Sequence, residues 1–223
     1  MKSEQSRRKF IVNSSKIVAT IVGLVTFGKY FSIAQTKNNT IVKKPIINYG
    51  NNDNILVVYD SQFGSTAKVA EFIGKNLSIS DQKVDVKKIN EVKDLSIYSH
   101  IIIGSAIQYD KWMTEAKDFI IKNEIALSTK SVSFFLVCLV LSKKTDKATI
   151  KANGYATKVK NLVPKIKVNN FGKFAGVLDY SKMSFGQRIL AKGIFAIIGV
   201  KEGDYRDWNS IKQWSESIDI KSC

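Results

Sequence analysis

Aliphatic runs alternate with amphipathic stretches from residue 55 to the end of the chain. Residues 55–59, 100–105 and 131–141 are almost continuously apolar, and residues 83–89 and 171–180 are mixed. The stretches between them and after the last one predict helices at residues 66–77, 114–127, 148–163 and 207–218. Five strands joined by helical crossovers indicate a doubly wound α/β fold, whose parallel sheet is covered on both faces. Ligands of such sheets bind at the carboxyl ends of the strands.

The first 34 residues have a different pattern. A basic start that includes Arg7 and Arg8 precedes an apolar stretch of about a dozen residues, which is short for a spanning helix of roughly 20. Small residues at Ser32 and Ala34 follow. This layout predicts a signal peptide of the twin-arginine type at residues 1–34, a linker at 35–53 and an exported domain at 54–223. The alternative is a membrane anchor with a basic flank.

Charge narrows the classes of partner. The chain carries a net charge of +16, and removal of residues 1–34, with six Lys/Arg and one Asp/Glu, leaves +11. A basic domain suits an anionic lipid surface or an acidic partner. Nucleic acid is excluded by the predicted export and by the lack of a zinc-finger or RNA-binding motif. Cys138 is expected to be a core thiol, Cys223 is terminal, and His100 is expected to be structural.

A small polar turn follows the first strand. Residues 61–66, with the sequence SQFGST, supply hydroxyl groups and a glycine where a buried strand changes to a helix. Hydroxyls, a flexible backbone and a helix amino terminus can bind a phosphate without any lysine or arginine. The turn lacks the P-loop and dinucleotide-binding patterns. A serine-rich turn that only caps the helix is the alternative.

Two further loops are predicted at the same edge. Residues 104–112 follow the third strand, and residues 139–144 follow the fourth. Tyr109 and Trp112 offer flat rings for stacking, so one phosphate site beside an aromatic slot indicates a mononucleotide flavin. The alternative is that both are surface aromatic residues that pack on a neighbouring helix.

At these residues the chain resembles the flavodoxin family and, more narrowly, the menaquinone-dependent protoporphyrinogen oxidases. The matching stretches occur in order: SQFGST, IIIGSAIQYDKW, LVCLVLSKK, NGYATKV, FAGVLDY and a final DW. The resemblance implies strand order 2-1-3-4-5 and FMN as the cofactor. It also implies FMN contacts from three loops, made by Ser61, Gln62, Phe63, Gly64, Ser65, Thr66, Ala106, Ile107, Gln108, Tyr109, Leu139, Val140 and Ser142.

An insertion separates the fifth strand from the last helix. Residues 181–203 interleave basic and apolar side chains, and such a helix can lie on an anionic membrane surface. The resembling oxidases have a comparable insertion on their membrane and quinone side. An ordinary helix covering the sheet is the alternative. The expected function is FMN-dependent oxidation with a quinone or a redox protein as acceptor. An exported soluble electron carrier is the second interpretation, and a non-redox binding module is the third.

Overall fold

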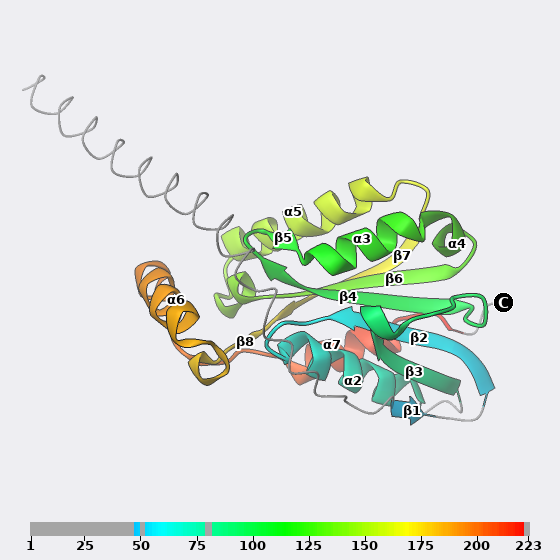
Figure 1. The fold of residues 1–223 in the computed structure, drawn as a ribbon, viewed down its shortest axis with the longest axis horizontal. Coiled ribbons are helices and arrows are strands. Elements are labelled where there is room, and N and C mark those ends of the chain that lie inside the picture. Colours follow the sequence, from blue (N-terminus) through cyan, green and yellow to red (C-terminus); the bar gives the residue numbers. More distant parts are fainter. Residues whose placement is uncertain (1–46, 50–51, 79–81, 221–223) are drawn as a thin grey trace, which may run out of the picture. The chain divides into compact units, whose positions relative to one another are not determined.

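Five parallel strands form the centre of the main sheet (Figure 1). Their order is β3-β2-β4-β6-β7, which is the predicted order 2-1-3-4-5. The parallel α/β prediction is therefore confirmed. The strands are β2 (Asn52–Asp60), β3 (Gln82–Lys88), β4 (His100–Gln108), β6 (Ser131–Cys138) and β7 (Val168–Ala175).

The computed structural model describes residues 47–49, 52–78 and 82–220. The predicted signal peptide, most of the predicted linker and Cys223 lie outside the described residues. In the described part of the linker, β1 (Ile47–Tyr49) pairs antiparallel with β3. The strand at residues 83–89 was expected near an edge, and β1 covers its outer side.

Helices cover both faces of the sheet (Figure 1). On one face, α2 (Ser65–Leu77) and α7 (Trp208–Glu216) pack over Ile55 and Val57 of β2. On the other face, α3 (Thr114–Lys122), α4 (Glu124–Ser128) and α5 (Asp146–Leu162) lie over Leu56 and Val58. Successive strand residues point to opposite faces. A strand buried on both sides is therefore apolar throughout, as the aliphatic runs indicated.

Two predicted elements change type part-way along. The helix expected at 114–127 is divided between α3 and α4 at Asn123, whose side-chain amide donates to the carbonyl oxygen of Phe119 (2.8 Å) and ends α3. The apolar run of the fourth strand leaves the sheet after Cys138 and continues as a 3₁₀ turn, η4 (Leu139–Ser142). Both differences arise from local hydrogen bonding, which an apolar pattern does not encode.

The insertion forms after the fifth strand. That strand was expected at 171–180, and it ends at Ala175. A short strand, β8 (Val177–Leu178), follows and pairs antiparallel with β9 (Gly203–Asp204). Between β8 and β9 lie η5 (Tyr180–Lys182) and α6 (Phe185–Ile198). The predicted inserted helix is thus present before the last helix.

Gly104 tests the packing of β4. A Cβ atom added there would lie 1.9 Å from Cζ of the buried Phe135 ring. We expect Gly104→Ala to lower the free energy of unfolding by about 3 kcal/mol, because the ring has no free space to move into. Gly154→Ala in α5 is the control, because the added Cβ would meet nothing within 4 Å. This substitution should stabilise the helix by about 0.5–1 kcal/mol. Urea unfolding measures both, and equal effects would contradict this packing.

Candidate functional site

Three loops meet at the carboxyl edge of the sheet. β4 pairs in parallel with β2 on one side and with β6 on the other. The segments that leave these strands, residues 61–64, 109–110 and 139–142, therefore emerge at one edge. Gln108 at the end of β4 donates a side-chain hydrogen bond to Gln62 in the first loop. The structure thus brings the predicted site segments together from sequence positions about 80 residues apart.

The first loop ends at Gly64, which precedes α2 with a φ of 83°. This left-handed conformation strains residues that carry a side chain, so glycine suits the position. The Gly64 amide donates to Ser61 Oγ (3.1 Å), and no side chain caps the helix. Thr66 is buried, and Ser65 Oγ is buried without a hydrogen-bond partner among the described residues. The loop therefore offers an unused hydroxyl and an uncapped helix amino terminus.

The second loop is a tight hairpin between β4 and β5 (Lys111–Trp112). Its two central residues, Tyr109 and Asp110, have φ values of 49° and 61°. The carboxylate of Asp110 accepts a hydrogen bond from Tyr155 and pairs with Lys151 Nζ at 2.9 Å. These contacts hold the turn against α5 through Asp110. Tyr109, the other central residue of the turn, is 65% exposed. Tyr109 thus has the exposure expected of a stacking residue.

Trp112 does not have that exposure. It is only 3% exposed, and its ring lies 5.5 Å from the Phe134 ring and 6.3 Å from the Phe171 ring, centroid to centroid. The return of β5 along β4 turns its side chain into the core, and Ser105 Oγ accepts from the Met113 amide (3.1 Å) just after it. Both proposed roles, cofactor stacking and surface packing, are therefore wrong for Trp112.

The remaining predicted residues line the ends of β4 and β6. Ala106, Ile107 and Gln108 become partly exposed where β4 approaches its turn. In η4, Leu139, Val140 and Ser142 are also partly exposed, and the Ser142 hydroxyl donates to the Leu139 carbonyl at 2.7 Å.

His100 and Cys138 take no part in the three loops. His100 begins β4 at the opposite edge of the sheet, and burial lowers its pKa. Cys138 is a core residue, and burial raises the pKa of its thiol to about 11. Both residues are buried, as expected. Within the described ranges, no group of three His, Cys, Asp or Glu side chains is arranged to hold a metal ion.

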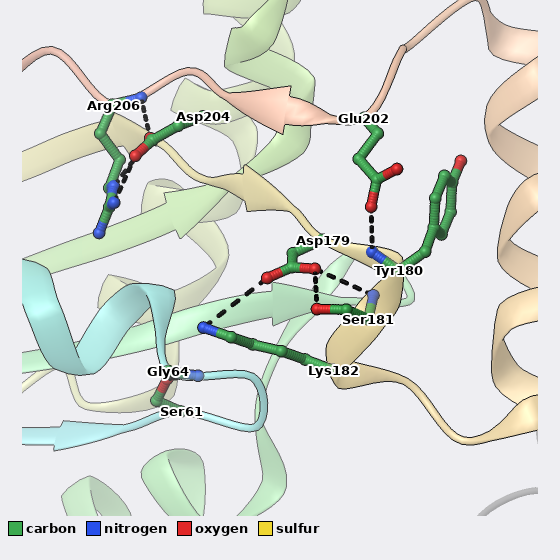
Figure 2. A network of polar contacts seen from close by, with 9 residues as sticks. All are labelled: Ser61, Gly64, Asp179, Tyr180, Ser181, Lys182, Glu202, Asp204 and Arg206. Atoms are coloured by element: carbon green, nitrogen blue, oxygen red, sulfur yellow. Dashed lines mark hydrogen bonds and ion pairs between the residues drawn. The ribbon is translucent and has the colours of Figure 1, made fainter.

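A cavity at the start of α2 was not predicted. It has a volume of about 210 Å³ and lies between the first loop and the two ends of the insertion. Lys182 and Arg206 come from the insertion side, and Figure 2 shows Lys182 extending toward Gly64. Both cations are more than 110 residues from the loop in sequence. The pairing of β8 with β9 and the hydrogen bond from the Tyr180 amide to Glu202 (2.7 Å) bring the two ends of the insertion together.

Asp60 was also not singled out, although it ends β2 immediately before the first loop. It is 9% exposed, and its Oδ2 has no hydrogen-bond partner within the described residues. Burial and, to a smaller degree, the Glu115 carboxylate raise its pKa to about 6. A charged carboxylate is therefore held next to the site at a cost in stability.

Asp60→Asn should remove the cost in stability of burying this charged carboxylate. Because the folded pKa lies above the unfolded value of 3.8, the contribution of Asp60 to stability falls as the pH rises from about 4 to about 6 and is then constant. We expect the variant to be more stable by about 2 kcal/mol above pH 6, and nearly equal to wild type below pH 4. Urea unfolding between pH 4 and pH 8 measures this.

Asp94→Asn is the control of opposite sign. Asp94 accepts from the Ser96 hydroxyl (2.7 Å) and amide (2.8 Å), which lower its pKa. It therefore stabilises the fold above its unfolded pKa and loses this effect as the pH falls. Asp94→Asn should destabilise the protein near pH 7 and have little effect in acid. A pH-independent effect of Asp60→Asn would contradict the burial argument.

Solved structures with similar folds include several flavodoxins. Flavodoxin 2 from Bacillus cereus is 21% identical, with a TM-score of 0.42 over 66% of this chain and 99% of that chain. A flavodoxin from the domain Archaea is 20% identical, with a TM-score of 0.40 over 66% and 99%. Rubredoxin oxygen:oxidoreductase from Desulfovibrio gigas is 12% identical, with a TM-score of 0.46 over 76% and 36%.

The family comparison covers most of the domain. Curated proteins gave no match. The sequence model of the flavodoxin domain matches residues 56–204, which include β2 from Leu56 onward, the three loops and the whole insertion. This range is more than half of the 223-residue chain. It contains every residue predicted to contact the cofactor, and the chain therefore belongs to the flavodoxin domain family.

Proposed function

We propose that the chain is an exported FMN-dependent oxidoreductase that docks on a membrane surface and passes electrons to a quinone. The observation that carries the proposal is the exposed apolar face of α6. An exported soluble carrier that exchanges electrons with a redox protein is the second candidate.

Family membership implies a flavoprotein with FMN as its cofactor. The residues at the carboxyl edge fit this group. Ser65 Oγ is a buried hydroxyl in need of a partner, and a Cβ at Gly64 would meet nothing within 4 Å, so the loop is open on that side. Residues 61–66 would bind the phosphate, and the exposed Tyr109 would stack on the ring system. Bound FMN supplies the redox chemistry, and the chain holds and orients it.

Helix α6 exposes large apolar side chains on its outer face. None of its residues is buried, and Phe185, Ile189 and Ile197 are 78%, 59% and 85% exposed. At 100° per residue these three lie on one side of the helix, with Gly193 and Ala196 also exposed there. Surface helices of soluble domains normally present charged residues on this side. An exposed apolar side of this kind is typical of a helix that lies in a membrane interface.

Residues at the two ends of α6 stabilise the helix independently of the sheet. Ser184 and Gln187 make a capping box at its start, and Gly199 ends it with a φ of 67°. Arg188 donates to the Tyr180 carbonyl (3.0 Å) and to the Met183 carbonyl (3.4 Å), which ties the inner side to η5. The outer side is thereby left for a partner.

The position of α6 suits a lipid-soluble acceptor. Lys143, which follows η4, donates to the Ile198 carbonyl at the end of the helix. The third cofactor loop is therefore joined to the apolar helix. The basic side chain of Lys192 is exposed on α6 and would attract an anionic headgroup, which contributes about 1 kcal/mol. No helix in the described part of the chain is long and apolar enough to cross a membrane.

The electron donor is a separate part of the proposal. The resemblance to menaquinone-dependent protoporphyrinogen oxidases makes protoporphyrinogen the first donor to test. The basic charge of the domain, +11 without residues 1–34, supports a membrane surface over an ordinary soluble carrier.

Removal of the apolar face should abolish membrane binding. We expect a chain starting at residue 35 to float with anionic vesicles, because the exposed apolar area contributes about 25 cal/mol per Å² on burial. Phe185→Ser/Ile189→Ser/Ile197→Ser should lower vesicle binding at least tenfold and slow the reoxidation of reduced FMN by a vesicle-borne menaquinone. Flotation and stopped-flow absorbance measure the two effects.

The control removes equally exposed isoleucines elsewhere. Ile97, Ile125 and Ile150 are 59%, 73% and 68% exposed and lie outside the insertion. Their triple Ser variant should bind vesicles and react with quinone as the parent chain does. If the parent chain ignores vesicles and quinone, the carrier is the better interpretation. If both triple variants lose binding equally, α6 is not the docking element.

Export is tested separately. Replacement of Arg7 and Arg8 by lysine should retain the protein inside the cell, because the twin-arginine pathway recognises the pair. Fractionation of cells that produce each form measures this, with Lys9→Arg as a control that keeps both arginines. Unchanged fractionation would instead indicate an anchor or a different export route.

A further inference from the structure

The cavity at the start of α2 has walls from two distant parts of the chain. Gly64, Ser65 and Lys68 form the wall on the α2 side. Residues at or next to the two ends of the insertion, including Lys182 and Arg206, form the opposite wall (Figure 2). Its volume of about 210 Å³ is several times the roughly 30 Å³ occupied by one water molecule. The cavity can therefore hold a small polar group together with water.

The guanidinium group of Arg206 is buried in the wall of this cavity and is held in place by its neighbours. Its side chain is only 7% exposed, its Nε donates to Asp204 Oδ1 at 2.8 Å, and its Nη2 pairs with Asp204 Oδ2. The guanidinium carbon lies 4.5 Å from the centre of the Trp208 ring, which in turn packs 4.9 Å from the Phe72 ring on α2. These contacts hold the guanidinium against α2.

One donor of Arg206 is left over. Its Nη1 is buried and has no hydrogen-bond partner among the described residues. On the facing wall, Ser65 Oγ is also buried and has no hydrogen-bond partner among the described residues. A buried unsatisfied donor is costly, and a charged one more so. Two such groups beside a helix amino terminus suit an anion that accepts from both.

Lys182 adds a second cation at the other end of the insertion. Its Nζ lies 3.8 Å from Asp179 Oδ2, a longer contact than a direct hydrogen bond, and its side chain is about half exposed. The Asp179 carboxylate is already engaged by the amide (2.9 Å) and hydroxyl of Ser181. Lys182 can therefore turn toward an anion at Gly64. With Lys68, the cavity has three cations and two carboxylates.

We infer that this cavity binds a phosphate monoester, and that Arg206 and Lys182 bind the phosphate together with residues 61–66. This inference rests on the proposed FMN cofactor, whose phosphate is such a group. It extends the sequence-based expectation, in which the loop binds phosphate without any lysine or arginine. It also gives the insertion a role in cofactor affinity, beyond any role in docking.

The test compares FMN with riboflavin, which lacks the phosphate. The full chain, freed of flavin, is titrated with each ligand and followed by flavin fluorescence. We expect Arg206→Gln to weaken FMN binding at least tenfold, as loss of a charge-assisted hydrogen bond does, and to leave riboflavin binding within twofold. Lys182→Gln, at a more exposed position, should weaken FMN binding about threefold.

Lys201→Gln is the matched control. It removes one positive charge from the same insertion, at an exposed residue that does not line the cavity. It should change neither affinity by more than twofold. Circular dichroism melts of all variants verify folding. If Arg206→Gln does not fold, Lys182→Gln and Lys68→Gln decide the outcome through the same FMN-to-riboflavin ratio.

A second arm uses inorganic phosphate alone. Phosphate should raise the melting temperature of the wild-type and Lys201→Gln proteins above that in chloride of equal ionic strength, and should not do so for Arg206→Gln. The inference is wrong if the wild type binds FMN and the cavity variants lose affinity for FMN and riboflavin equally. It is also wrong if these variants lose affinity for neither ligand. In both cases the proposed FMN cofactor is unaffected. If the wild type binds no flavin, the proposed function fails, and the phosphate arm alone supports or overturns the cavity.

Discussion

Burial of the sheet on both faces is the constraint on which the rest of the structure depends. Leu56 and Val58 pack under one helical layer, and Ile55 and Val57 pack under the other. Polar groups are thereby excluded from most of the length of the central strands and collect where the strands end. Asp60, Ser61 and Gln108 occur at such ends. In a parallel sheet these ends lie side by side, so the packing of the core also determines where a ligand can bind.

The sequence predicts this part of the molecule well because its signal is local or periodic. Strand order, the loop at residues 61–66 and the exposed Tyr109 follow from apolar runs, a turn composition and a family resemblance. Trp112 could not be placed in this way, since a two-residue strand decides which way its ring points. An aromatic residue in a loop has the same sequence signature whether it faces inward or outward.

Long-range pairing accounts for the residues that were missed. Arg206 is near Gly64 because β8 pairs with β9, and because the Tyr205 amide donates to the Gly176 carbonyl (3.1 Å), which returns the chain to the start of α2. Neither strand exceeds two residues, too few to leave an alternating pattern. Asp60 was visible in the sequence, but its raised pKa depends on burial by α3, a tertiary contact. A charged residue at a strand end gives no sign of this by itself.

The edges of the main sheet have a further consequence. On one side the sheet, as far as the described residues form it, ends in β1, which has three residues. On the other side it ends in β7, where Lys173 is exposed among otherwise apolar neighbours. Short outer strands and exposed lysines are the means by which natural sheets prevent pairing with a second molecule. A basic chain with an apolar surface helix is at risk of self-association, and these two edges protect it from growth into β-linked aggregates.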